Sequence, residues 1–142
     1  MQPRQEFSSS FSHSQYYFIA AAVATAIAGI VHLYFVPPTL ELFATRPLTF
    51  LLPLIFFLGS GIAQIFWILP MIRRWGKPWY YIGIAGNIAF TILYVITRLP
   101  GNPITGRGVG VNVLDLVCEL AQVAYIAITV VILAKEGRSL II

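Results

Sequence analysis

The residues best suited to chemistry are two carboxylates in the stretch NVLDLVCEL, residues 112 to 120, which opens the last apolar run of the chain. Asp115 and Glu119 are four residues apart, so on a helix both side chains project from the same face. Acidic groups at the mouth of a long apolar segment are costly unless they have partners. His32 and Arg98, near the ends of two other apolar runs, are the partners that we expect for them.

This set of side chains suits three kinds of chemistry. An imidazole and two carboxylates are ligands for a transition-metal ion, which would be held by His32, Asp115 and Glu119. Arg98 can instead pair with the acids and join two helices. The same groups can also exchange a proton or bind the polar head group of a ligand. A transition-metal ion is the one cofactor that the sequence suggests, and these interpretations stay open at this point.

The elements that carry these residues are helices of membrane-spanning length. Of the 142 residues, 58% are hydrophobic and 10% are charged, and the mean hydropathy is +0.84, which is outside the range of ordinary soluble domains. A bilayer core needs about 20 apolar residues of helix. Four runs meet this requirement, at about 17–36, 48–72, 79–97 and 113–134. We therefore predict an all-α polytopic membrane protein, with one four-helix transmembrane domain at 16–135, a mobile polar tail at 1–15 and a short C-terminal tail at 136–142.

The depth of each polar residue along its helix can be estimated from a rise of about 1.5 Å per residue. His32, Arg98, Asp115 and Glu119 all fall near one end of the bundle, so we expect them to form an inward-facing cluster. By the same count, we expect Glu41 and Arg46 to lie within reach of the cluster as ligands or ion-pair partners. Near mid-membrane, we expect interhelical hydrogen bonds from Gln64, Asn87 and Gln122. Cys118, the single cysteine, is expected on the side of its helix away from the acids.

Three connecting segments have the composition of turns: PPTLELFATRP, RRWGKP and LPGNPITGRGVGV. The last is long enough to cap the bundle. Cations are biased toward one side of the membrane, with Arg46, Arg98 and Arg107 on one side and Arg4, Arg73, Arg74, Lys77, Lys135 and Arg138 on the other. This bias predicts a multi-pass protein of the cytoplasmic membrane with both termini in the cytoplasm. The net charge of +4 forms no basic stripe that would indicate nucleic-acid binding.

The order of several short motifs resembles a widespread group of small four-helix membrane proteins of bacteria and archaea. The motifs are VHLYFVPP, RPLTFLL, FFLGSGIAQIFW, YIGIAGN, TRLPGNPITG and VLDLVCEL, and they cover about residues 29–124. The resemblance implies a set of recurring polar or turn residues, namely His32, Gln64, Gly86, Asn87, Arg98, Pro103, Asp115 and Glu119. It implies no particular activity. In architecture alone, the chain is also distantly similar to the DoxX-like and emopamil-binding-like membrane proteins.

Three functions remain open at the level of the sequence. The first is a small accessory or binding subunit whose cluster holds a metal ion, a proton or a ligand head group, in a larger membrane oxidoreductase for example. The second is an enzyme that acts on a lipophilic substrate with histidine and carboxylate groups as acid and base. The third is a purely structural four-helix protein. Partners would be the lipid bilayer and either other membrane subunits or further copies of the chain, which would pack on small residues such as Ala20 and Ala24. Cavity shape discriminates between the first two, because a metal site needs a tight polar cluster and an enzyme needs an apolar pocket beside the acids.

Overall fold

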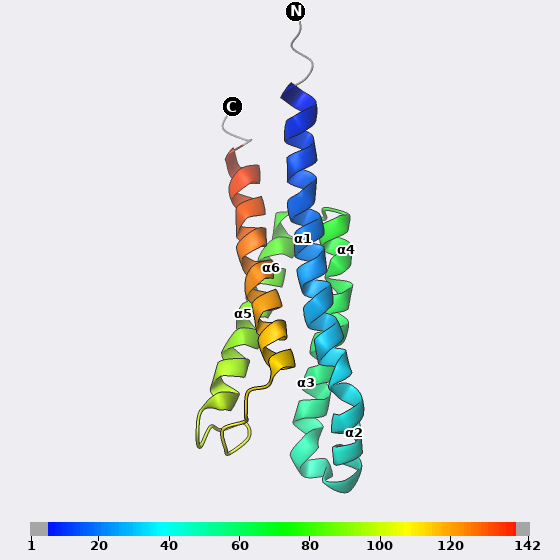
Figure 1. Ribbon diagram of the computed structural model, residues 1–142, viewed down its shortest axis with the longest axis vertical. Coiled ribbons are helices and arrows are strands. Elements are labelled where there is room, and N and C mark those ends of the chain that lie inside the picture. Colours follow the sequence, from blue (N-terminus) through cyan, green and yellow to red (C-terminus); the bar gives the residue numbers. More distant parts are fainter. Residues whose placement is uncertain (1–5, 139–142) are drawn as a thin grey trace, which may run out of the picture.

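The computed structural model describes residues 6–138, with side chains from residue 14 to residue 137. Within this range all regular structure is helical, and four segments are long and apolar enough to cross a membrane: Ser14–Thr45, Pro47–Ile72, Lys77–Arg98 and Val113–Gly137. The predicted all-α class with four membrane-spanning segments is confirmed. The helices are α1 (Glu6–Tyr34), α2 (Val36–Thr45), α3 (Pro47–Phe66), α4 (Ile68–Ile72), α5 (Lys77–Arg98) and α6 (Val113–Arg138), as Figure 1 shows.

The predicted turn PPTLELFATRP is helical, which corrects the sequence interpretation. Helix α1 ends at Tyr34, and α2 begins at Val36 with its prolines in the first turn. A proline is tolerated there because the first N–H groups of a helix have no carbonyl partner in the preceding turn. The prolines therefore interrupt the helix at Phe35 and then start the next one, and the chain reverses only at Arg46.

Two further boundaries differ from the expected ones. The segment predicted as a single helix at 48–72 is divided at Trp67 into α3 and α4. Pro70 has no N–H to offer the carbonyl of Phe66 four residues earlier, which gives a physical reason for the break. Helix α1 begins at Glu6, within the segment expected as a polar tail. Residues 1–5 and 139–142 of the two predicted tails, Arg4 among them, lie outside the described residues.

Helix α1 is the centre of the bundle and packs against both α3 and α6, while α5 packs on α6 and α2 packs on α3. Its inner face consists of small residues and ends in a histidine, with Ala21, Thr25, Ala28 and His32 all buried. Small side chains allow close packing between helices in lipid, where the hydrophobic effect does not drive helix association. Ala24, expected on a partner-binding face, is instead buried within the bundle.

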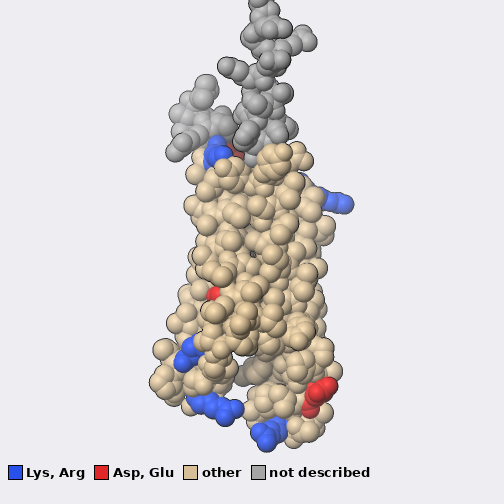
Figure 2. Space-filling view, viewed as in Figure 1, with Lys and Arg blue, Asp and Glu red and all other residues tan. Residues whose placement is uncertain are grey.

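Helices α3 and α5 make no close backbone contact with each other anywhere in the described chain. Figure 1 shows them diverging toward the end of the bundle that lies away from the termini. On the face shown in Figure 2, charged side chains gather toward the two ends and the waist is almost free of them. Large apolar side chains such as Ile19, Ile30 and Leu120 are exposed along the helices, as expected for surfaces that face lipid.

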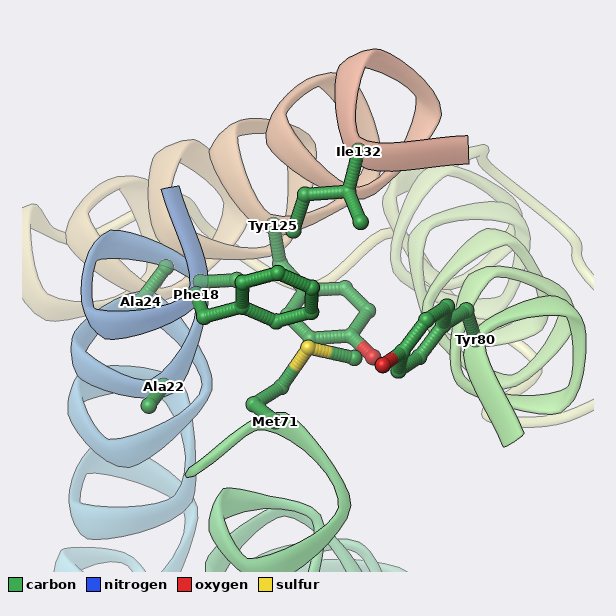
Figure 3. Packing of buried hydrophobic residues seen from close by; sticks show 8 residues of the cluster. Phe18, Ala22, Ala24, Met71, Tyr80, Tyr125 and Ile132 are labelled. Atoms are coloured by element: carbon green, nitrogen blue, oxygen red, sulfur yellow. The ribbon is translucent and has the colours of Figure 1, made fainter. Parts of the chain in front are cut away.

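The half of the bundle nearer the termini has a closely packed core. Phe18, Met71, Tyr80, Tyr125 and Ile132 come together there from four helices, and the tyrosine hydroxyls face each other in Figure 3. Helix α5 approaches this core at a glycine. A Cβ atom built on Gly83 would collide with the Tyr125 hydroxyl and the Trp67 indole nitrogen.

We expect Gly83→Ala to lower the free energy of unfolding by about 1–3 kcal/mol, the usual cost of overpacking a close-packed interior. Gly86→Ala is the matched control on the same helix, because a Cβ at that position meets nothing within 4 Å. Thermal unfolding of the purified protein in detergent measures both. Equal melting temperatures for the two variants would contradict this close packing at Gly83.

Candidate functional site

A cavity of about 680 Å³ lies at the end of the bundle away from the termini. Helices α3 and α5 form its side walls, α1 and α6 contribute polar residues, and the loop 99–112 covers its end. Figure 2 shows the surface hollowed at this end of the molecule. Most of the lining is apolar, and its aromatic part comprises Phe35, Phe50, Phe56, Phe57, Phe90 and Tyr94. The cavity is within the size range of sites for small organic ligands.

The predicted polar residues divide into those that line this cavity and those that do not. His32, Arg98, Asp115 and Glu119 all lie in its wall, although three different helices carry them. Glu41 and Arg46, expected within reach of the cluster, are exposed and lie outside the lining. The α2 helix explains this difference, because it carries Glu41 along the bundle end and places Arg46 directly after its last residue, instead of folding both back as a loop would.

Asp115 has a structural role that accounts for its presence. Its carboxylate accepts a hydrogen bond from the backbone N–H of Asn112 at 3.3 Å, while the Asn112 side chain accepts one from the Asp115 N–H at 2.9 Å. This reciprocal pair caps the N-terminus of α6. The same carboxylate oxygen, Oδ2, lies 2.7 Å from Nη2 of Arg98 and joins α5 to α6. Arg98 also donates to Thr97 Oγ1 at 3.0 Å and stacks on the Tyr94 ring at 4.1 Å.

Glu119 lies one helical turn beyond Asp115 and has fewer contacts, among them a hydrogen bond with the Thr91 side chain. It lines the cavity, and its Oε2 atom is buried without a hydrogen-bond partner. A buried polar atom without a partner costs about 1–3 kcal/mol, and more if the group is charged. Capping and helix pairing therefore explain Asp115, but they do not account for the buried Oε2 atom of Glu119.

His32 is held by a chain of side-chain amides that begins on α5. Asn87 donates from Nδ2 to the Gly83 carbonyl at 2.8 Å, which directs its Oδ1 toward Gln64. Gln64 donates from Nε2 to that oxygen at 3.5 Å, so its own Oε1 faces Nδ1 of His32 at 2.7 Å. An amide oxygen only accepts hydrogen bonds, and Nδ1 must therefore carry the proton in this pair. We call these three side chains, His32, Gln64 and Asn87, the amide relay.

The amide relay selects one tautomer of the neutral imidazole, in which Nε2 carries the lone pair and lies 3.8 Å from Cys118 Sγ. Aromatic rings surround the imidazole, with centroids at 5.4 Å for Phe56, 6.1 Å for Phe57 and 5.9 Å for Phe90. These rings were not identified from the sequence. The helical spacing from Asn87 to Phe90, three residues along the polar stripe of α5, was a signal that could have found one of them.

Cys118 lies on the cavity side of α6, contrary to the sequence interpretation. It is buried, and its Sγ atom is 3.8 Å from Nε2 of His32 and accepts a hydrogen bond from Gln122 Nε2 at 3.4 Å. The physical reason is the helical pitch, because residues three positions apart, such as Asp115 and Cys118, lie on the same side of a helix. Gln122 in turn accepts a bond from Thr91 at 3.4 Å, which joins α6 to α5.

The loop 99–112 is organised around a single buried side chain, Asn102. Its Nδ2 atom lies within hydrogen-bond distance of the Thr97, Leu99 and Arg107 carbonyls, and its Oδ1 accepts from the Thr105 N–H at 2.8 Å. The Asn-Pro dipeptide at 102–103 was a turn signal in the sequence. It gave no indication that the loop would fold back over the end of α5 and line the cavity.

Among the side chains that the structure describes, residues 14–137, no three of His, Cys, Asp or Glu form a group that could hold a metal ion. The transition-metal site predicted from His32, Asp115 and Glu119 therefore finds no support. Asp115 is engaged by Arg98, and Nδ1 of His32 by Gln64, so only part of the predicted ligand set is free.

Comparisons of the chain with protein-family models, curated proteins and solved structures return no match. The resemblance to the bacterial and archaeal four-helix group remains a prediction. The fold and the cavity are the findings from which function must be argued.

The amide relay leads to a spectroscopic prediction. The chain has two histidines, so His13→Ala leaves His32 as the only imidazole for ¹⁵N NMR. We expect a pyrrole-type signal for Nδ1 and a pyridine-type signal for Nε2. Asn87→Leu frees Gln64 to rotate, and both tautomers should then be observed. A protonated Nε2 in the parent protein would contradict the relay.

The two acids should respond differently to the same isosteric change. Asp115→Asn weakens the bonds to Arg98 and to the helix N-terminus, and we expect it to lower the free energy of unfolding by about 1.5–3 kcal/mol, the range for hydrogen bonds to charged groups. Glu119→Gln breaks no ion pair of the described chain and should leave stability unchanged or higher. Denaturant titration of both variants in detergent tests the difference. A larger loss in the Glu119 variant would show that the roles are reversed.

Proposed function

We propose that this integral membrane protein binds a lipophilic small molecule in the cavity, with His32 and Glu119 contacting its polar head group. The observation that carries the proposal is the composition of the wall, which is mostly apolar and aromatic around a few convergent polar groups. That combination is typical of ligand sites, in which apolar walls supply affinity and polar groups supply orientation.

The path of entry supports a ligand that is dissolved in the bilayer. Helices α3 and α5 have no close backbone contact in the described chain, so side chains alone close the space between them. Phe56 and Phe90 meet across it with ring centroids 5.8 Å apart, and Gln64 and Asn87 meet through a hydrogen bond of 3.5 Å. Two aromatic rings can rotate aside without breaking backbone hydrogen bonds, and a lipophilic molecule could then enter from the lipid.

The competing functions are less well supported. A tight metal site lacks a sufficient group of ligands in the described residues. A purely structural role accounts for Asp115, which caps a helix and pairs with Arg98, but not for Glu119 or for a cavity of about 680 Å³. In a protein with a purely structural role, an apolar cavity lowers stability in proportion to its volume and brings no benefit.

Acid–base catalysis on the bound molecule is a second candidate. The amide relay presents Nε2 of His32 as a proton acceptor, and Glu119 supplies a carboxylate in the wall of the same cavity. These are the groups that proton-transfer enzymes use. Binding is the requirement that both candidates share, and it is tested first.

We also propose that the protein lies in the cytoplasmic membrane with both termini in the cytoplasm, so that the cavity is at the outer end. Cations support this orientation, since Arg73, Arg74, Lys77 and Lys135 belong to the end that carries the termini. Arg46, Arg98 and Arg107 belong to the other end. A binding subunit within a larger membrane assembly is the cellular role that we infer.

Ligand occupancy can be tested before the ligand is identified. Leu93→Trp places a large side chain in the cavity wall, whereas the neighbouring Ile92→Trp, at a position that is 52% exposed, places it outside the lining. We expect mass spectrometry of organic extracts from the purified proteins to find one class of lipophilic molecule with the parent and with Ile92→Trp. It should be depleted at least about tenfold in Leu93→Trp, because overpacking a site by several heavy atoms costs more than about 1.4 kcal/mol. Identical extracts from all three would overturn the proposal.

A further inference from the structure

The turn between α4 and α5 carries three cations within five residues, Arg73, Arg74 and Lys77. We call residues 73–77 the basic turn. Arg73 and Arg74 are exposed, and Lys77 is half-buried. None of the three has an ion-pair partner among the side chains that the structure describes. The only acid among those side chains at this end of the bundle is Glu136, on α6. The basic turn is therefore a concentration of positive charge that the described protein leaves unpaired.

The depth of the basic turn corresponds to the polar head groups of a bilayer. Figure 1 shows α1 and α6 continuing beyond this turn toward the termini. The Arg74 guanidinium stacks on the Phe18 ring at 4.7 Å, and α1 extends about three turns further, to Glu6. The membrane-spanning segment of α1 begins at Ser14, close to that contact. The cations of the turn thus lie where the apolar part of the bundle ends.

Aromatic and apolar side chains adjoin these cations. Trp75, within the basic turn, packs on Trp79 of α5 and on Phe66 of α3, with ring centroids at 4.9 and 5.9 Å. Trp75 and Phe66 are still 38% and 40% exposed. The exposed residues Ile62 and Leu69 continue the face of Phe66 at helical spacing. Cations, interfacial rings and lipid-facing apolar side chains follow one another in the order of the phosphate, glycerol and acyl chains of a phospholipid.

We propose that the basic turn binds the head group of an anionic phospholipid, with Arg73 and Lys77 contacting its phosphate. The turn between these two residues is tight, since the Trp75 N–H donates to the Pro70 carbonyl at 3.1 Å, and both long side chains can reach one phosphate. Arg74 adds charge beside them. Cations at the end of a membrane-spanning helix attract anionic lipids. A zwitterionic head group is attracted less, because its own ammonium group neutralises its phosphate. The basic turn is separate from the cavity, which lies at the other end of the bundle.

Two lipids with the same acyl chains test the head group. Dioleoyl phosphatidylglycerol has a net negative charge, and dioleoyl phosphatidylcholine has none. Native mass spectrometry of the full chain in detergent, titrated with each lipid, gives the dissociation constant of the first bound molecule. We expect phosphatidylglycerol to bind the parent protein at least about tenfold more tightly, because each cation near the head group is worth about fivefold. A role of these cations in membrane topology alone predicts equal binding, and equal dissociation constants would overturn the proposal.

Single charge removals locate the site. Arg73→Gln and Lys77→Gln should each weaken the binding of phosphatidylglycerol by about fivefold and leave that of phosphatidylcholine unchanged. Arg46→Gln is the matched control and should change neither, because Arg46 is also exposed but lies at the other end of the bundle. The melting temperature of each variant checks that it is folded. An equal loss in all three variants would show that net charge alone attracts the lipid and would overturn the proposal. A loss in Leu93→Trp alone would overturn it too, since the lipid would then occupy the cavity.

Discussion

The amide relay is the interaction on which the rest of the site depends. Inside a bilayer no water is available to satisfy a side-chain amide or an imidazole, so each must find its partner in the protein. Asn87, Gln64 and His32 do this in sequence, and the hydrogen bonds run from α5 through α3 to α1. Because α3 and α5 lack close backbone contact over the described residues, this relay and the Phe56–Phe90 pair are what connect the two cavity walls. The relay also has a fixed direction of hydrogen bonding. It starts at the Gly83 backbone carbonyl, which can only accept a hydrogen bond, and this fixes the orientation of the Asn87 amide.

The rest of the bundle can be understood as support for this arrangement. Near the termini the helices pack closely around Tyr80 and Tyr125, and Gly83 allows α5 to approach there. Away from the termini, the prolines of α2 interrupt the first helix at Phe35, and α3 and α5 separate. Close packing at one end and divergence at the other is what produces a cavity in so small a chain. Asp115 and Arg98 close the bundle beside it, and Asn102 holds the loop 99–112 across its end.

Several features were predictable because they depend on local composition or on depth. The four membrane-spanning segments follow from hydropathy alone, since about 20 apolar residues match the bilayer. That His32, Arg98, Asp115 and Glu119 would lie at the same end followed from counting residues along each helix. The α2 helix was missed, because a double proline is a turn signal in most contexts and is accepted in a helix only in the first turn. The prediction that Cys118 lies on the side of α6 away from the acids was wrong, although the helical pitch alone was sufficient to place this residue correctly.

By itself, the sequence determined the class of the protein and the height of its polar residues in the membrane, because hydropathy and helical rise are properties of each segment taken alone. Tertiary structure decided which of these residues share a wall, which acid is engaged by Arg98, and which nitrogen of His32 carries the proton. These depend on how far each helix is rotated and tilted against the others, and that is set by small packing differences summed over the whole bundle. The cavity is the clearest case, since no segment encodes it and only the divergence of α3 from α5 creates it.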